Sequence, residues 1–270
     1  MSAAAIATPA LGAHGTSRKT RAARWRLARV LLFVGVLELA SRMAWIDPVS
    51  FIPPSKMVQG AYQLLASGGY TADILETLSN AMMGIVLAVS VGFVFGVCLF
   101  KMPRVRRVLD PLLLSYYAVP IFVVYPILIV IMGPNRWPLV TIGFLFGVVS
   151  MAVNTLTGLE RVPRVLLRAA RAMRLSTFEE VRLITLPSSL PFVFTGIKLS
   201  VVYVFIAVIA GEFVLSGSGF GFRIAFAYNN FDNATMYGLM LLLLVFVGAL
   251  NGVLQLIEGR LYNRNNREQA

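Results

Sequence analysis

The sequence predicts an all-α protein that crosses a membrane about six times. Three observations support this class: 58% of the residues are hydrophobic, 13% are charged, and the mean hydropathy is +0.78. These values lie outside the range of ordinary soluble domains. A hydrocarbon core about 30 Å thick requires roughly 20 apolar residues per helix, and the chain contains several runs of that kind.

The apolar runs define six expected spans, near residues 27–46, 80–100, 109–132, 137–159, 190–215 and 236–258. Residues 80–258 form the five-helix core. The span at 27–46 is interpreted as a retained anchor, because a long polar stretch precedes it and no clear cleavage site for a signal peptidase follows. The remaining segments are a basic head that is expected to be disordered, an external segment with a possible short helix, and a tail, at residues 1–26, 47–79 and 259–270.

Basic residues are distributed very unevenly over the predicted loops. Nineteen of the 24 Lys and Arg residues lie on one predicted side, in the head, in the connection after residue 100, in the 160–187 loop and in the tail. The loops of the other side carry only Lys56, Arg136 and Arg223. Because cytoplasmic loops are enriched in Lys and Arg, both termini are predicted to be cytoplasmic. The net charge of +12 therefore indicates orientation in a bilayer rather than nucleic-acid binding.

Glycines four residues apart occur in three of the spans. This spacing lets helix backbones approach closely, although glycine is also simply common in membrane helices. The pairs are Gly92 and Gly96, Gly143 and Gly147, and Gly248 and Gly252.

Two prolines are predicted to kink or unwind the third span. Pro120 and Pro126 lack the backbone N–H that a helix requires, so nearby carbonyl groups lose their partners. Such backbone is tolerated at membrane depth only against protein or a water-filled cavity. Pro120, Tyr125 and Pro126 are therefore candidates for lining a translocation path.

Charged residues inside the spans are costly, so each needs a reason. Glu38 and Arg42 are four residues apart and can pair on one helix face. Lys198 can extend to the membrane surface in a structural role, or contribute to the path. Glu212 either ties down the external loop or touches the translocation path.

Catalytic chemistry finds little support in the sequence. The chain has no Gly-Lys dipeptide, so it lacks a phosphate loop that ends in Gly-Lys-Ser/Thr. The single His14 and the single Cys98 cannot form a metal cluster or a disulfide. The Gly217–Gly221 stretch resembles a nucleotide-binding loop, but it lies on the external side without a preceding strand and is interpreted as a flexible re-entrant turn. The chain is therefore not expected to be an enzyme or to hold a cofactor or metal.

The 160–187 loop is the most informative segment. Pro163 suits the first turn of a helix, and the arginines that follow are spaced to share one broad helical face. That face could meet acidic lipid headgroups or an acidic protein groove, or could simply be solvated. The arginines are Arg161, Arg164, Arg168, Arg171 and Arg174.

The spacing within this loop resembles the signature loop of ABC importer permeases. The family pattern is Glu-Ala-Ala, three residues, Gly, nine residues, Ile, one residue, Leu-Pro. Here Ala169 and Ala170 match its start, and Ile184, Leu186 and Pro187 match its end. Similarity to the nitrate/sulfonate/taurine-type branch covers roughly residues 50–265, including segments 195–198, 211–213, 217–221 and 258–261.

The resemblance implies a type I ABC importer permease-like fold in the bacterial inner membrane, and a dimer with a second permease copy or paralogue. It also implies two ATP-binding subunits, an external solute-binding protein, and a small solute such as a sulfonate or nitrate. Lys198 mildly favours an anion. The implied ATPase-coupling residues are Arg164, Arg168, Ala169, Ala170, Arg171, Arg174, Ile184, Leu186 and Pro187. The candidates for the translocation path are Pro120, Tyr125, Pro126, Lys198 and Glu212.

Two positions depart from the family pattern. Arg168 replaces the acidic residue, and Arg174 replaces a glycine that permits a bend with positive φ. We expect either a partner ATPase with compensating acidic residues or a heterodimer whose other permease keeps the usual motif. A structural or sensory membrane subunit is an alternative. An ion-coupled secondary carrier is another, but it would need midplane carboxylates or broken helices, and often an internal repeat.

Overall fold

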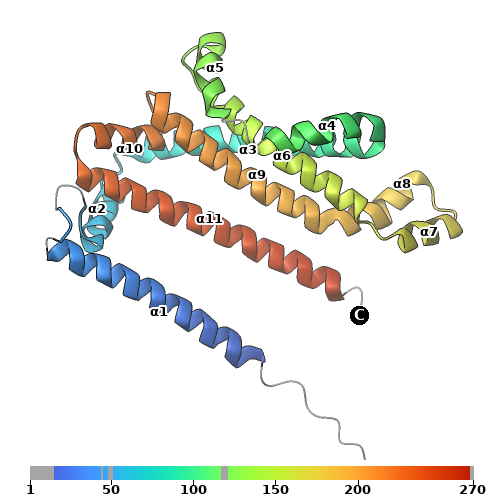
Figure 1. The fold of residues 1–270 in the computed structure, drawn as a ribbon, viewed down its shortest axis with the longest axis horizontal. Coiled ribbons are helices and arrows are strands. Elements are labelled where there is room, and N and C mark those ends of the chain that lie inside the picture. Colours follow the sequence, from blue (N-terminus) through green and yellow to red (C-terminus); the bar gives the residue numbers. More distant parts are fainter. Residues whose placement is uncertain (1–14, 44, 48–50, 117–120, 268–270) are drawn as a thin grey trace, which may run out of the picture.

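A computed structural model describes residues 15–43, 45–47, 51–116 and 121–267. Their regular structure is helical without strands, which confirms the predicted all-α class (Figure 1). The elements in chain order are α1 (Gly15–Arg42), α2 (Pro54–Ser67), α3 (Thr71–Lys101), α4 (Pro103–Ser115), the 3₁₀ turn η2 (Ile121–Val124), α5 (Tyr125–Met132), α6 (Trp137–Glu160), α7 (Arg164–Ala172), α8 (Thr177–Glu180), the π-helical turn η3 (Val181–Thr185), α9 (Leu186–Leu215), α10 (Phe220–Asn229) and α11 (Asn233–Arg267).

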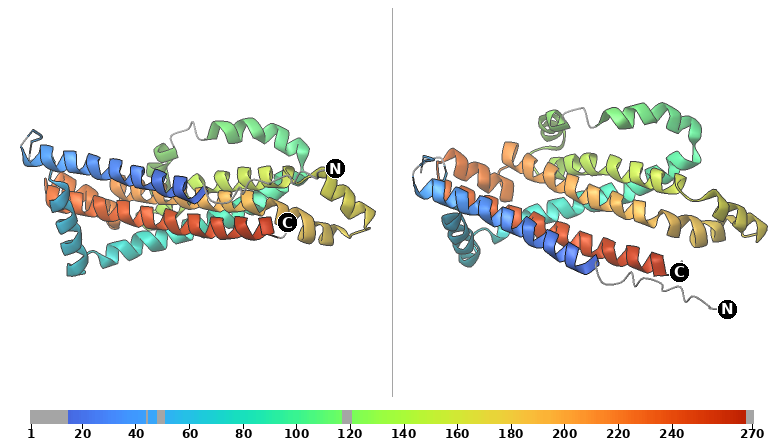
Figure 2. Two further views of the ribbon diagram at one scale, coloured as in Figure 1. Left: turned by 90° about the horizontal axis from the view of Figure 1, so that it is seen from below. Right: turned by 60° about the horizontal axis from the view of Figure 1, so that its bottom comes forward.

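Three long helices, α3, α6 and α9, pack along one another and form the centre of the molecule (Figure 2). Fully buried Ala88, Val204 and Val208 lie among them. The backbones approach closely at two of the predicted glycine pairs. A Cβ on Gly92 would lie 2.6 Å from the Val148 carbonyl oxygen, and one on Gly147 would lie 2.8 Å from the Ala88 Cβ. The tight-contact prediction is therefore confirmed for both pairs.

The third glycine pair behaves differently. A Cβ on Gly248 or Gly252 would meet nothing within 4 Å. Both residues belong to α11, which packs against α2 and α10 near its start and meets α9 through larger side chains, such as Phe246, whose ring centroid lies 5.7 Å from that of Phe205. Within the described part of the chain this pair mediates no close helix contact.

Helix α1 runs along the outside of the molecule and is tied to the start of α2 (Figure 1). The Arg42 Nε donates to Glu38 Oε1 at 2.6 Å, which confirms the predicted pair. The Ser55 backbone N–H donates to Glu38 Oε2 at 2.9 Å. The Glu38 carboxylate thus accepts from the first turn of α2, where backbone N–H groups lack helical partners.

Four helical stretches of the described residues are long and apolar enough to cross a membrane: Thr71–Lys101, Trp137–Glu160, Phe178–Asn229 and Asn233–Gly259. They correspond to the predicted spans at 80–100, 137–159, 190–215 and 236–258. The prediction of about six spans is therefore supported for four of them.

The predicted span at 109–132 is not one continuous helix. Helix α4 ends at Ser115, and η2 and the short α5 follow. Pro126 lies in the first turn of α5, where its missing N–H costs nothing. Pro120 lies outside the described residues. The expected local unwinding is thus observed in the 3₁₀ turn η2, and the α-helix resumes at α5 with Pro126 in its first turn.

Two helix starts differ from the prediction. Helix α1 begins at Gly15, inside the head that was expected to be disordered, because its Ala-, Arg- and Lys-rich sequence favours helix. Helix α3 begins at Thr71 rather than near residue 80. Its first turns carry polar residues that resemble a loop in sequence but have partners elsewhere in the fold.

Candidate coupling surface and the clasp at the opposite end

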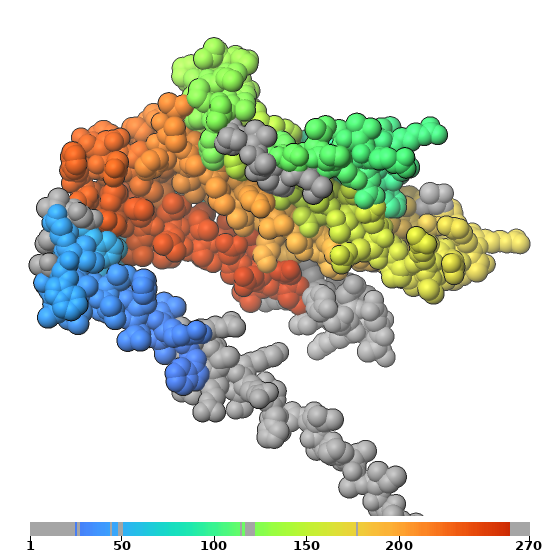
Figure 3. Space-filling view, viewed as in Figure 1, coloured from blue at the N-terminus to red at the C-terminus, as the bar shows by residue number. Residues whose placement is uncertain are grey.

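Helix α7 projects with α8 from one end of the three central helices (Figures 1 and 3). Pro163 is its N-cap, one residue before the first turn in which the loop sequence placed it. At its other end, Leu175 N–H donates to the Ala170 carbonyl and Arg174 N–H to the Arg171 carbonyl, both at 3.1 Å. This pattern is a Schellman cap, which places one residue in the left-handed region and usually employs glycine.

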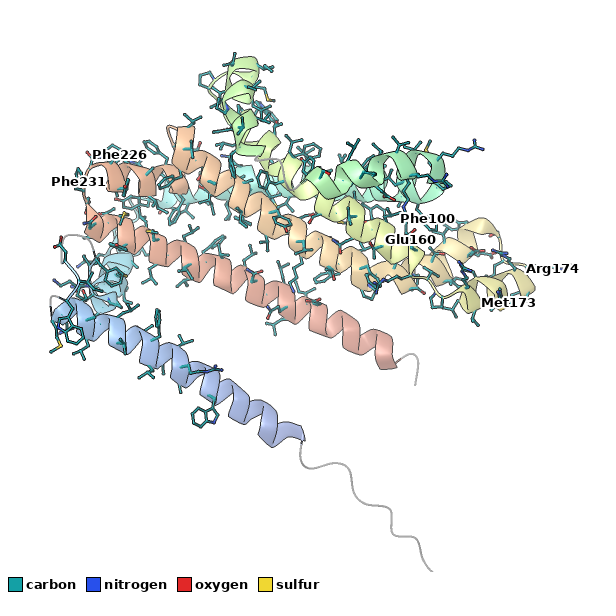
Figure 4. All side chains as sticks on the ribbon, in the orientation of Figure 1. Phe100, Glu160, Met173, Arg174, Phe226 and Phe231 are labelled. Atoms are coloured by element: carbon teal, nitrogen blue, oxygen red, sulfur yellow. The ribbon has the colours of Figure 1, made fainter. Side chains whose placement is uncertain are left out.

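Arg174 occupies that left-handed position with φ 54°. The backbone therefore does require a positive φ where the resembling family has glycine. An L-residue in this conformation costs about 1–2 kcal/mol relative to its preferred regions. Phe231, at the end of α10, adopts the same conformation with φ 56° and is 85% exposed. Figure 4 shows the two residues at opposite ends of the molecule.

Four arginines of this segment are exposed without a partner. The side chains of Arg164, Arg168, Arg171 and Arg174 make no hydrogen bond or ion pair with any residue that the structure describes. Arg161 differs, because it caps α6 and lies 5.2 Å from the Phe192 ring centroid. The predicted face of five arginines is thus corrected to four, of which three lie on α7.

The opposite side of α7 is packed. Ala170 is fully buried, whereas Ala169 is exposed among the arginines. Val165 and Met173 are 72% and 63% exposed. The surface that α7 presents is therefore both cationic and apolar. We name Val165, Met173 and the four arginines the coupling surface.

A capping box starts the helix after α7. Ser176 N–H and Oγ donate to Glu179 Oε2 at 2.8 and 2.7 Å, and Glu179 N–H donates back to Ser176 Oγ. The π-helical η3 follows and passes directly into α9. Pro187 lies in the first turn of α9, Ile184 is half-buried and Leu186 is 40% exposed. The wider turn fits a proline that cannot donate to a carbonyl four residues earlier.

An ion pair fixes α4 beside the start of the projecting segment. The Arg106 guanidinium contacts the Glu160 carboxylate with both terminal nitrogens and lies 3.3 Å from Asp110. Hydrogen bonding by Glu160 raises the pKa of Arg106. Glu160 is the last residue of α6, so the pair holds α4 to α6 next to α7.

A buried carboxylate organises the other end of the molecule. Glu212 is completely buried, and its Oε2 accepts from Thr77 Oγ1 at 2.8 Å and from Gly221 N–H at 3.0 Å. A Cβ on Gly219 would lie 2.5 Å from the Glu212 carboxyl carbon, so only glycine lets the chain pass here. Of the two alternatives for Glu212, tying down the turn is the one observed.

Helix α3 supplies the other acceptors for this turn. Asp73 accepts from Gly219 N–H at 3.2 Å and from Arg223 Nε at 2.8 Å. Thr77 Oγ1 accepts from Phe220 N–H, and Glu76 accepts from Ser218 Oγ. The N–H groups at the start of α10, which have no helical partners, are thus satisfied by side chains. We name this set the clasp: Asp73, Glu76, Thr77 and Glu212 with residues 216–221.

The sequence placed the clasp residues of α3 in an external segment and did not identify them. The sequence does contain a hint, because the polar residues at positions 73, 76 and 77 would share one face if this segment were helical. Nothing in the local sequence connects that face to the glycine-rich turn at residues 217–221. The expectation of a flexible turn is corrected, since its backbone is held by buried carboxylates and a hydroxyl.

The other candidates for the path occupy different places. Lys198 Nζ pairs with Glu258 Oε2 at 2.9 Å and joins α9 to α11, which matches the structural alternative. Tyr125 is 3% exposed, and its Cζ would lie 3.6 Å from a Cβ on Gly211, the neighbour of Glu212. The structure thus brings Tyr125 and Glu212 to one end of the molecule, while Lys198 lies elsewhere along α9.

Fold and sequence together define a class of protein: a multi-pass membrane permease. The family described as "Binding-protein-dependent transport system inner membrane component" matches residues 82–267, and this chain belongs to that family. The resemblance that the loop spacing indicated is thereby confirmed.

Two named permeases and one solved transporter structure are similar to this chain. The nitrate import permease protein NrtB of Leptolyngbya laminosa is 24% identical over 220 residues, covering 78% of this chain and 77% of the relative. The taurine transport system permease protein TauC of Escherichia coli (strain K12) is 25% identical over 214 residues, covering 74% and 78%. A chain of the inward-facing MetNI methionine ABC transporter superposes with a TM-score of 0.59 at 18% identity, over 72% of this chain and 95% of that one. The latter match shows a common fold.

Proposed function

We propose that this permease belongs to an ATP-driven importer and is coupled to a cytoplasmic ATP-binding subunit through residues 160–187. The observation that carries the proposal is the coupling surface, where the side chains of four exposed arginines have no partner among the described residues. A partner with an acidic groove would supply the missing counter-charges. Val165 and Met173 would add apolar contact area at the centre of the interface.

The connections of α7 suit the transmission of a movement. On one side α7 follows α6, whose last residue Glu160 is fixed to Arg106. On the other side α8 and η3 continue into α9. Because α6 and α9 pack along each other and along α3, a partner that displaces α7 would move the central helices as rigid bodies.

The distribution of positive charge orients the molecule. We place the coupling surface and both termini in the cytoplasm and the clasp on the external side. None of the residues in the most apolar stretch of α11 is fully buried, and most of the described apolar side chains of α1 are exposed. These surfaces suit lipid and a second permease copy or paralogue in a two-fold dimer. A solute-binding protein would approach from the clasp side. Relatives named for nitrate, taurine and bicarbonate suggest a small acidic solute.

ATP-dependent uptake tests this proposal. Cells that express this permease with its candidate ATPase and binding protein should take up at least one of nitrate, 2-aminoethanesulfonate and bicarbonate, and a Walker-motif mutation in the ATPase should abolish that uptake. Uptake that persists without the ATPase would instead indicate a secondary carrier. Failure of all three solutes, together with failure to capture the ATPase, would favour a structural or sensory subunit.

The replacement of the family's acidic residue and glycine by Arg168 and Arg174 can be tested separately. The double variant Arg168→Glu plus Arg174→Gly restores the family pattern. If the partner groove is acidic, this variant should lose coupled uptake with the native ATPase, because a glutamate then faces that groove. Normal uptake would argue against a specialised partner.

A further inference from the structure

A polar cavity of about 400 Å³ lies at the clasp end, between the start of α3, the turn from α5 to α6, and the turn after α9. Its volume lies within the range of small-molecule sites. The polar part of its lining comes from Glu76, Tyr125, Asn135, Arg136, Ser216 and Ser218. Ile129 and Leu139 supply apolar wall.

Two opposite charges line this cavity without pairing. The Arg136 guanidinium makes no ion pair with any described carboxylate, and its one hydrogen-bond contact among the described residues is a weak one, 3.9 Å from Nη1 to Met83 Sδ. Glu76 Oε1 accepts from Ser218 Oγ at 2.7 Å, while Oε2 has no partner among the described residues. Elsewhere the fold pairs such charges directly, as in Arg223 with Asp73 and Lys198 with Glu258.

Two of the remaining polar side chains of the wall already have hydrogen-bond partners. Asn135 Oδ1 accepts from Trp137 N–H at 2.8 Å, and its Nδ2 donates to the Met132 carbonyl. Ser216 Oγ donates to the Ser218 carbonyl. Among the charged side chains of the lining, unused hydrogen-bonding capacity lies in the Arg136 guanidinium and the second oxygen of Glu76, and the Tyr125 hydroxyl of the same lining makes no hydrogen bond to a described residue.

We propose that this cavity is an external access site for a small zwitterion that carries an acidic group and an ammonium group, such as an aminoalkanesulfonate. The acidic group binds Arg136, whose planar fork of donors suits sulfonate or carboxylate oxygens. The ammonium group binds Glu76 Oε2. A simple anion of the same size would satisfy only Arg136 and would meet the uncompensated Glu76 carboxylate, so the site selects by repulsion as well as attraction.

The proposal rests on the proposed importer function and narrows its solute class. The cavity is also connected to the clasp. Ser218 donates a hydrogen bond to Glu76, and Ser218 belongs to the turn whose backbone is held by Asp73, Thr77 and Glu212. The turn that closes the cavity is thus positioned by buried hydrogen bonds rather than by the solute.

Two probes of nearly equal size test the proposal. Binding of 2-aminoethanesulfonate and of ethanesulfonate to the purified permease–ATPase complex is measured by saturation-transfer NMR. Wild type should bind the zwitterion about tenfold more tightly than the anion. Glu76→Gln should weaken zwitterion binding about tenfold and leave or strengthen anion binding, whereas Arg136→Gln should weaken both. Lys56→Gln, which removes an exposed charge of the same side outside the cavity, is the matched control and should change neither.

Equal affinity of wild type for both probes, or equal losses for both in Glu76→Gln, would overturn the proposal. The outcome is separate from that of the importer proposal. A complex that captures its ATPase but shows no preference would refute only the zwitterion site. Selective binding by a permease that captures no ATPase would instead refute the coupling.

Discussion

Replacing Arg174 by glycine should change two quantities in opposite directions: the stability of the cap at the end of α7 and the affinity for the ATPase. The left-handed conformation of Arg174 costs about 1–2 kcal/mol, and the greater freedom of glycine in the open state offsets part of the gain. A net stabilisation of about 1 kcal/mol corresponds to roughly fivefold less frequent opening of the cap. Loss of one exposed cation should weaken ATPase binding by about 0.2–1 kcal/mol, which is up to about fivefold.

Hydrogen exchange of the isolated permease measures the first effect. The amide of Leu175, which donates to the Ala170 carbonyl, should exchange about fivefold more slowly in Arg174→Gly. Titration with the ATPase measures the second effect, in the opposite direction. Arg174→Lys retains both the charge and the strained conformation, so it should change neither quantity.

Phe231→Gly is the matched control at the other end of the molecule. It relieves the same conformation in the Schellman cap of α10, so it should protect the Asp232 amide without altering ATPase affinity. Unchanged exchange at Leu175 in Arg174→Gly would refute the conformational argument. Unchanged ATPase affinity would refute the contribution of this charge.

Three further tests concern other contacts. Glu212→Ala leaves the buried Gly221 N–H without its acceptor, so it should destabilise the permease by about 1–3 kcal/mol in a thermal unfolding assay. Glu212→Gln should cost less. Equal melting temperatures of the two variants and wild type would contradict the stabilising role of Glu212 in the clasp. Gly147→Val places side-chain atoms against α3 and α9 and should sharply lower the yield of folded permease, while Gly248→Val should be tolerated; the reverse order would contradict the observed packing. A double-mutant cycle on Lys198→Ala and Glu258→Ala should give a coupling of about 0.5–1 kcal/mol, because the pair is half-exposed; zero coupling would mean that the ion pair adds no stability.

The sequence predicted those features that depend on local pattern. Apolar runs located the central helices, the four-residue spacing of Glu38 and Arg42 predicted their ion pair, and Pro163 marked the start of α7. Loop spacing identified the family before any geometry was known. Each of these signals is contained within a few turns of helix.

Features that depend on distant contacts were missed. Asp73 and Gly219 are 146 residues apart in sequence, so nothing local distinguishes a clasp acceptor from a loop aspartate. The arginine spacing predicted one face of five residues, but Arg161 belongs to the end of α6 because the chain turns at Pro163. The left-handed φ of Arg174 follows from the hydrogen bonds of the cap, which sequence spacing alone only suggested.

The most direct test of the coupling surface is co-purification of this permease with its candidate ATP-binding subunit. Wild type should capture the ATPase, and Arg171→Glu and Arg174→Glu should abolish or strongly reduce the capture. Lys101→Glu, which makes the same charge change at an exposed position at the end of α3, should leave it intact. Capture that is indifferent to both reversals, or equally sensitive to Lys101→Glu, would contradict the assignment of α7 as the surface that meets the ATPase.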